Sequence, residues 1–334
     1  MTTLPREVAM IDRLAAAFAR SPRQLNGRHE SDAELVRLGD SDTVLALTTD
    51  AIAEEIERGL YADPWLIGWM TVTVCASDLA AVGAAPLGIL INETLPDDLA
   101  AETGTQLQRG IGDACDASGL YVLGGDTNAG PHLHMSATAA GLVAGGAPLT
   151  RLGARPGERL FASGLLGLGA AYALLRLRGM AAPRYQPVAR MREGQLLRGL
   201  ASCAMDTSDG ALVTLDELGR LNGVGFVIEH DVAEVLHPAA RALAQTGLPA
   251  WTLLAGPHGE FELLFTVPDA RAAELASLAG RIGWAPVELG RVTSEPGVVL
   301  SDGTSLATGR IRDLFVEVGG DVERYVRELT RLPA

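Results

Sequence analysis

Residues 70–86 read MTVTVCASDLAAVGAAP, and this stretch says most about how the chain folds. Apart from two threonines and the pair Ser77–Asp78, every residue before the glycine at position 83 is apolar. The pattern predicts a buried helix over about 63–82 that Gly83 ends. An ionised carboxylate within such a helix is costly unless it is paired or bound to a metal. Asp78 is therefore either a metal ligand or the polar residue of a helix break at Ser77–Asp78.

Strand and helix patterns alternate on both sides of this helix. Before it, we expect an amphipathic helix over 6–20 and then a hairpin whose strands flank the turn 39–42. After it, strands are expected over 87–96 and 132–145, a helix over 97–119, and a strand that runs into a glycine turn over 120–127. The sequence pattern changes near Thr150, where a second series of expected strands and helices begins. The sequence predicts a mixed α/β (α+β) protein with two αβ domains, 1–150 and 151–334.

The composition of the 334-residue chain excludes several classes of function. Its formal net charge is −14, which disfavours nucleic acid and anionic membranes as partners, and no apolar run is long enough to cross a bilayer. All 27 basic residues are arginine, so mechanisms that need a lysine, such as a P-loop or a Schiff base, are excluded. The three cysteines are far apart and form no CxxC pair, which is typical of reduced thiols. With no signal pattern at the N-terminus, we expect a cytoplasmic protein.

Aspartates recur beside glycines or strand ends in three further segments. Gly124–Gly125–Asp126–Thr127 follows the apolar run LYVL, at a strand end of the kind that often binds ligands, although a plain turn would look the same. Asp50 follows an apolar strand, whereas Asp40 and Asp42 are also typical hairpin-turn residues. The segment MDTSDGA carries Asp206, Ser208 and Asp209, which is more than helix capping requires.

Taken together, the acidic segments indicate Mg²⁺ bound to a nucleotide. Carboxylates are hard oxygen ligands of the kind that Mg²⁺ prefers, and metal ions are the natural bridge between acidic loops and a triphosphate. A glycine-rich run at 163–169 is too weak a signal to identify a nucleotide fingerprint, and helix–sheet packing explains it equally well. His258 lies beside Glu260 in GPHGEFE and is a candidate pocket residue, whereas His132 and His134 have no third metal ligand nearby.

At this point the residues resemble thiamine-monophosphate kinase, within the superfamily of aminoimidazole ribonucleotide synthetase (AIR synthase). The resemblance runs from about residue 30 to 320. Its ordered landmarks are TTD (48–50), SDLAAVGAAP (77–86), GGDT (124–127), RLGARPGE (151–158), SGLLGLGAAYALL (from 163), DTSDG (206–210) and FELLFTVP (261–268). It implies an AIR-synthase-like N-terminal domain that binds ATP and Mg²⁺ and forms a β-barrel across a homodimer, and an AIR-synthase-like C-terminal αβ domain.

The resemblance also implies roles for individual residues. By motif match the metal ligands are Asp50, Asp78, Asp126 and Asp209, and Asp40 is added from the position of the family's Gly-Asp-Asp hairpin. Further nucleotide contacts are expected from Gly124, Gly125, Thr127, Arg151 and Ser208. Asp209, His258 and Glu260 are the candidate catalytic residues.

The chain departs from the family pattern mainly on the acceptor side. The first hairpin looks shortened, EEIERG replaces a Gly-His-Phe-type stretch, and Pro257–His258–Gly259–Glu260 replaces Gly-Gly-Glu-Asp. The resemblance thus implies a phosphotransferase that uses Mg-ATP but phosphorylates a small molecule other than thiamine monophosphate. Two alternatives remain open. One is an ATP-dependent ligase or cyclase that activates an amide or carboxylate oxygen, and the other is a non-catalytic nucleotide-binding relative.

Overall fold

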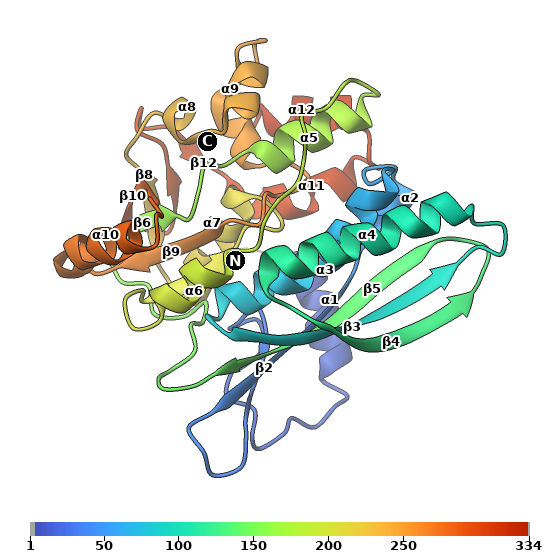
Figure 1. Ribbon diagram of the computed structural model, residues 1–334. Coiled ribbons are helices and arrows are strands. Elements are labelled where there is room, and N and C mark those ends of the chain that lie inside the picture. The colour runs from blue at the N-terminus through green and yellow to red at the C-terminus, as the bar shows by residue number, and fades with distance from the viewer. Residues whose placement is uncertain (1–3, 333–334) are drawn as a thin grey trace.

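The computed structural model describes residues 4–332 and contains two mixed sheets, each with its own helices (Figure 1). The first sheet belongs to residues 4–143, called here the N-terminal half, and the second to residues 159–332, the C-terminal half. The mixed α and β class expected from the sequence is confirmed. The boundary predicted near Thr150 falls in the segment that connects the two halves.

The N-terminal half is a five-stranded sheet with the order β1-β2-β5-β3-β4. Its elements are α1 (Arg6–Ala15), β1 (Glu34–Arg37), β2 (Val44–Ala51), α2 (Ala53–Glu57), α3 (Pro64–Ala81), β3 (Ala85–Leu95), α4 (Ala101–Ser118), β4 (Val122–Ala129) and β5 (His134–Val143). The predicted hairpin is present as β1 and β2, which pair antiparallel. The predicted buried helix is α3, which is one residue shorter than expected at each end, with Asp63 and Val82 as its capping residues.

Helices α3 and α4 pack closely against each other because two glycines face the partner helix. A Cβ atom on Gly68 would lie 2.1 Å from the carbonyl oxygen of Leu107, and one on Gly110 would lie 2.0 Å from that of Trp65. Both distances are far below van der Waals contact, so a larger residue at either position would force the helices apart. Since α3 also contacts β2, β5 and β7, this packing fixes the helix that carries Asp78.

Strand β4 forms one edge of the sheet and is exposed along its whole length. The glycine turn expected within 120–127 is wrong, because the residues Gly124–Thr127 continue the strand and pair with β3 in parallel. Propensity favoured a turn there, but ladder hydrogen bonds to β3 hold the glycines in extended structure. No closed barrel forms within this chain's described residues, and the barrel across a homodimer stays a prediction.

The C-terminal half is built on a seven-stranded sheet with the order β12-β11-β8-β10-β6-β9-β7. Its elements are β6 (Arg159–Ala162), α5 (Leu168–Leu177), α6 (Met191–Leu197), β7 (Cys203–Asp206), α7 (Ala211–Asn222), β8 (Gly225–Ile228), α8 (Val232–Val235), α9 (Pro238–Ala244), β9 (Leu263–Val267), α10 (Ala272–Arg281), β10 (Val287–Thr293), β11 (Gly297–Val299), β12 (Ser305–Leu306), α11 (Ile311–Glu317) and α12 (Val322–Leu329). Edge strand β7 lies against α3 of the N-terminal half. Among residues 4–332, no helix has the length and apolar character needed to span a bilayer.

Candidate active site between the two halves

Three aspartates from separate parts of the chain converge where the two halves meet. Asp32 precedes β1, Asp78 lies in α3, and Asp206 ends β7. One carboxylate oxygen of each lies within 4.8 Å of the corresponding oxygens of the other two. We call these residues the aspartate triad. Such spacing suits a cation bound between carboxylates, because unneutralised negative charges this close repel one another.

Burial and mutual repulsion raise the pKa values of the triad. Desolvation, and then the charges of Asp206 and Asp32, hold the pKa of the Asp78 carboxyl well above its usual range. The pKa of Asp206 rises to about 7, first because of burial and then because of Asp32. A raised pKa means that the ionised carboxylate is destabilised relative to the protonated acid. A bound divalent cation would stabilise the ionised form.

Hydroxyl groups and one arginine orient the triad. Ser77 Oγ donates to Asp206 Oδ2 at 2.6 Å, and Thr48 Oγ1 donates to Asp78 Oδ2. Arg151 Nη2 donates to Asp32 Oδ1 at 3.0 Å, and the Asp32 side chain is only 1% exposed. This ion pair places Arg151 beside the triad, and its single positive charge offsets part of the negative charge of the three carboxylates.

Asp50 and Asp209 extend the acidic region beyond the triad. In β2, Asp50 is two residues after Thr48, so both side chains lie on the sheet face that α3 covers. Desolvation by the surrounding protein atoms raises the pKa of Asp50, although part of its side chain is exposed to solvent. The charges of Asp209 and Glu7 raise this pKa further. Asp209 Oδ2 in turn lies 3.7 Å from Arg312 Nη1. The triad, Asp50 and Asp209 thus form one acidic region, and the guanidinium of Arg312 lies beside Asp209.

Asp126 lies on the opposite face of the first sheet. It is paired with Asn92, whereas Asp50 is paired with Ala137 on the helix-covered face. Its carboxylate is exposed and accepts a hydrogen bond from Asn128 Nδ2 at 2.8 Å. Thr127 points the other way and donates to Glu93 at 3.0 Å. Within one chain, therefore, Asp126 does not join the acidic region of the triad, Asp50 and Asp209.

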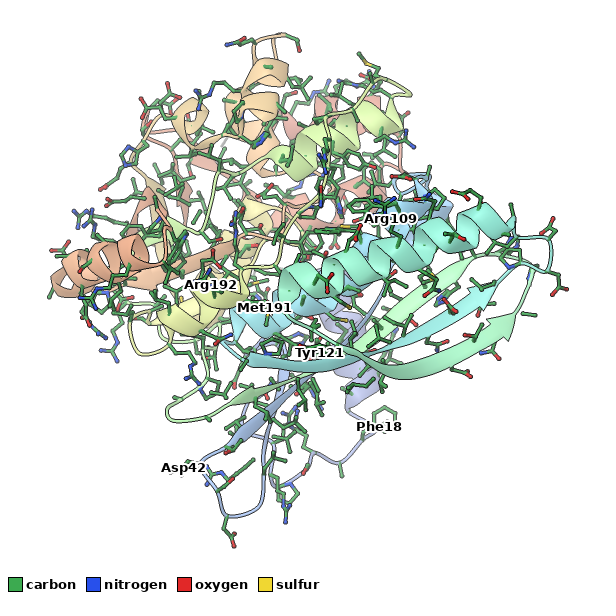
Figure 2. All side chains as sticks on the ribbon, in the orientation of Figure 1. Phe18, Asp42, Arg109, Tyr121, Met191 and Arg192 are labelled. Atoms are coloured by element: carbon green, nitrogen blue, oxygen red, sulfur yellow. The ribbon has the colours of Figure 1, made fainter. Side chains whose placement is uncertain are left out.

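Asp40 lies in the exposed turn between β1 and β2 and is not part of the triad. Its near neighbour Asp42 is labelled at the outer end of this hairpin in Figure 2. Sequence reasoning placed the acidic residue of the hairpin in the turn, whereas the structure brings Asp32, on the other side of β1, to Asp78 and Asp206. The pattern of an aspartate directly before an extended run, ESDAELV, was the available signal for Asp32.

His258 belongs to a second, buried polar cluster. Its Nε2 lies 2.6 Å from the Tyr61 hydroxyl and 3.0 Å from the Tyr185 hydroxyl. Burial lowers the pKa of His258 to about 4, so the ring is neutral at physiological pH. Tyr185 donates to the Gly259 carbonyl at 2.7 Å, so its hydroxyl proton is not available to Nε2.

Glu260 holds the start of α5 and is not one of the triad residues. Its Oε2 accepts from the Gly167 backbone N–H at 2.9 Å, while its buried Oε1 has no partner within the described part of the chain. Burial raises the pKa of Glu260 to about 8, so the group is mostly protonated near neutral pH. Next to it, Phe261 adopts a φ of 59°, a left-handed conformation that is rare for a bulky residue and typical of functional sites.

A small cavity of about 30 Å³ adjoins His258. Leu60 and Phe315 contribute apolar walls, Glu54 and Glu55 contribute carboxyl groups, and the guanidinium of Arg58 lies 5.2 Å from the centre of the Phe315 ring. One oxygen of Glu55 is buried with no partner among residues 4–332, and burial raises the pKa of Glu55 to about 7. Sequence reasoning missed Tyr61, which stands in no recognisable motif, and noted Glu55 only as part of EEIERG.

Comparisons with known proteins agree with this architecture. The family "AIR synthase related protein, N-terminal domain" matches residues 30–143. The thiamine-monophosphate kinase of Methanospirillum hungatei is 33% identical over 72% of this chain and 80% of its own length, and that of Escherichia coli O157:H7 is 31% identical over 79% and 83%.

Solved structures show the same likeness over more of the chain. One described as AaThiL complexed with AMPPCP and TMP has a TM-score of 0.73 at 25% identity and covers 92% of this chain and 97% of its own. Escherichia coli HypE, a hydrogenase maturation protein, matches with a TM-score of 0.67 over 90% of this chain and 95% of its own, but at 21% identity it shows the fold alone. The chain belongs to the thiamine-monophosphate kinase family of the AIR synthase superfamily and is an enzyme of the kinase type.

Proposed function

We propose that this protein is a Mg²⁺- and ATP-dependent phosphotransferase that acts on a small molecule other than thiamine monophosphate. The observation that carries the proposal is the aspartate triad, whose carboxylates come from both halves of the chain and lie within 4.8 Å of one another. Their raised pKa values indicate a site suited to a divalent cation, which would neutralise the phosphates of a bound nucleotide.

The acidic residues divide into two groups in this proposal. Asp32, Asp78 and Asp206 would hold Mg²⁺ among buried side chains, and Asp50 and Asp209 would hold it nearer the surface. Arg312 lies beside Asp209 and offers a guanidinium to phosphate oxygens. Phosphoryl transfer needs positioning and charge neutralisation more than covalent chemistry, so no nucleophilic side chain is required here.

We place the acceptor next to His258. In AaThiL the bound molecules are AMPPCP and TMP. The region that we assign to the acceptor in this chain carries a neutral histidine bonded to Tyr61 and Tyr185, and the adjoining cavity has a volume of only about 30 Å³. Since about 10–15 Å³ of such space suffices for one water molecule, the cavity has room for about two, and a two-ring acceptor would require the side chains to move. The proposed acceptor is therefore smaller than thiamine monophosphate, or enters only when Arg58 swings away from Phe315.

A second copy of the chain is the proposed partner of the first sheet. Tyr121, Val122 and Leu123 lead into or lie in β4 and are 74%, 50% and 60% exposed, and Leu90 on β3 is 46% exposed. An uncovered edge strand with such residues is suited to pairing with another sheet. Asp126 lies on the same exposed face as Leu90, so a homodimer would bury it at the interface. The three cysteines are all free and buried, which supports the proposed cytoplasmic location.

The test is a thermal shift titration of the purified protein with ATP, with MgCl₂ and with both together. Stabilisation only by the combination supports metal-bridged nucleotide binding, because a ligand that binds the native state raises the melting temperature. Phosphorus NMR with candidate acceptors then separates the two catalytic alternatives. A stable phosphorylated product identifies a kinase, whereas free phosphate together with a new bond identifies a ligase. No shift under any condition would favour the non-catalytic relative and contradict the proposal.

A further inference from the structure

The guanidinium of Arg312 lies between two carboxylates that come from distant parts of the chain. Its Nη1 lies 3.6 Å from Oε2 of Glu7 and 3.7 Å from Oδ2 of Asp209. Glu7 belongs to α1, Asp209 to the segment between β7 and α7, and Arg312 to α11. Both distances are longer than a hydrogen bond, so charge attraction alone holds the guanidinium to these two groups. Arg312 is therefore available to a ligand that offers it hydrogen bonds.

Glu7 adds a negative charge to the acidic region of the triad, Asp50 and Asp209. Desolvation raises the pKa of Glu7, although 57% of its side chain is exposed, and the charge of Asp209 raises it further. The charge of Glu7 in turn raises the pKa of Asp50. A phosphate group bound to Arg312 would lie beside Glu7 as well, and like charges at such short range repel each other. Glu7 and a phosphate are thus alternative partners for one guanidinium.

Helix α1, which carries Glu7, packs only weakly on the rest of the protein. It has ten residues, of which only Val8 is buried, and no side chain caps its start. Met10 and Leu14 are 47% and 58% exposed. Beyond the helix, Phe18 is 73% exposed and is labelled at the edge of the molecule in Figure 2. Because an isolated helix of this length is marginal in water, contacts at its ends decide whether α1 stays in place.

Polar contacts hold α1 at two points. At its start, the backbone N–H of Arg6 donates to Asp313 Oδ2 at 2.9 Å, next to Arg312 on α11. Near its end, Asp12 Oδ1 lies 3.1 Å from Nε2 of His29. The first contact joins α1 to the C-terminal half and the second joins it to the N-terminal half. Contacts of this partly exposed kind are weak, so a ligand can replace the first while the second keeps the helix tethered.

We propose that α1 is a displaceable strap and that Glu7 occupies the guanidinium of Arg312 until a nucleotide phosphate takes its place. Mg²⁺ at Asp209 withdraws that carboxylate from Arg312, and phosphate oxygens then bind the guanidinium through charge-assisted hydrogen bonds. Glu7 is left facing like charges, and the start of α1 moves out. The inference rests on the proposed function, since it takes the ligand to be Mg-ATP, and it adds how the free protein restrains that site.

The first test is calorimetric titration with Mg²⁺ and a nonhydrolysable ATP analogue. Glu7→Gln keeps the size of the side chain and removes its charge, so it should bind about twofold to fivefold more tightly than the wild type, as the loss of an exposed ion pair allows. Glu317→Gln is the matched control, because Glu317 is an exposed glutamate at the other end of α11. It should bind like the wild type.

Repeating Glu7→Gln in an Arg312→Gln background separates competition from simple repulsion. If Glu7 acts by occupying Arg312, its removal brings no gain in affinity once the guanidinium is absent. A gain of the same size in both backgrounds would mean that Glu7 repels the nucleotide without competing for Arg312, and it would overturn the proposal.

Hydrogen exchange, measured by mass spectrometry, follows the strap itself in the wild-type protein. The amides of residues 6–16 are expected to exchange faster when Mg²⁺ and the analogue are bound, although a ligand that binds the native state slows exchange elsewhere. Slower or unchanged exchange in α1, or equal affinity of Glu7→Gln and the wild type, overturns this inference and leaves the proposed function standing. No binding of the analogue by the wild type overturns both.

Discussion

Ser77 donates a 2.6 Å hydrogen bond to Asp206, and this bond joins the buried helix of the N-terminal half to an edge strand of the C-terminal half. Ser77 is fully buried and Asp206 is 2% exposed. The bond therefore lies in the contact between the halves and positions a triad carboxylate at the same time. Site geometry and the packing of the two halves are linked through this pair, so a change at either residue is expected to affect both.

Replacing Ser77 by alanine should loosen this link. The substitution removes a buried hydrogen-bond donor and leaves one carboxylate oxygen of Asp206 without its partner. The free energy of unfolding should fall by about 1–3 kcal/mol. Because Asp206 then loses an interaction that lowers its pKa, the loss should be larger at pH 8 than at pH 5. Chemical denaturation at the two pH values measures the difference. An equal loss at both would mean that Ser77 acts only through packing.

The metal-free protein should lose stability as the pH rises through the acid range. The pKa of Asp206 is about 7 in the folded chain against 3.8 for the ordinary side chain, so the native state binds the proton more tightly. This contribution is therefore present below about pH 4, decreases as the pH rises toward 7 and is lost above that. Asp206→Asn should flatten the profile. Urea denaturation from pH 4.5 to 8 in EDTA tests this, and a wild-type profile as flat as that of the variant contradicts the raised pKa.

Asp32 and Asp40 form a matched pair for testing the site assignment. Asp32→Asn should weaken Mg-ATP binding at least tenfold, because it removes one carboxylate of the triad, whereas Asp40→Asn should leave it unchanged. Calorimetric titration of both variants with Mg²⁺ and a nonhydrolysable ATP analogue measures the effect. If Asp40→Asn proves the weaker binder, the turn and not the triad holds the metal.

The comparison of Asp32 with Asp40 also shows where sequence reasoning reaches its limit. The buried helix, the hairpin and the strand–acidic turn–helix unit around Asp206 could be predicted because each has a local pattern of burial and turn residues. The sequence could not predict which aspartates lie close together, because their proximity depends on how β7 packs against α3. Gly124–Thr127 was predicted as a turn for a related reason, since only pairing with β3 makes it a strand.

Glu260 offers a test of protonation at the start of α5. Since its pKa is about 8, glutamine mimics the form that dominates at pH 7, and Glu260→Gln should leave the melting temperature nearly unchanged there. Glu260→Ala should cost about 1–3 kcal/mol, because the Gly167 N–H loses its acceptor in a buried place. Differential scanning calorimetry of both variants decides, and a large loss in the glutamine variant would show that the ionised carboxylate is the stabilising form.

The exposed edge of the first sheet predicts how the chain assembles. Leu123 is 60% exposed on β4, and a lysine there would place a charge within a dimer interface. Leu123→Lys should therefore shift the protein from dimer to monomer in analytical ultracentrifugation. Met180→Lys is the control, because Met180 is similarly exposed at 55% but follows α5, away from β4. A wild-type protein that sediments as a monomer at micromolar concentration, or a Leu123→Lys variant that remains dimeric, would remove this sheet from the proposed interface.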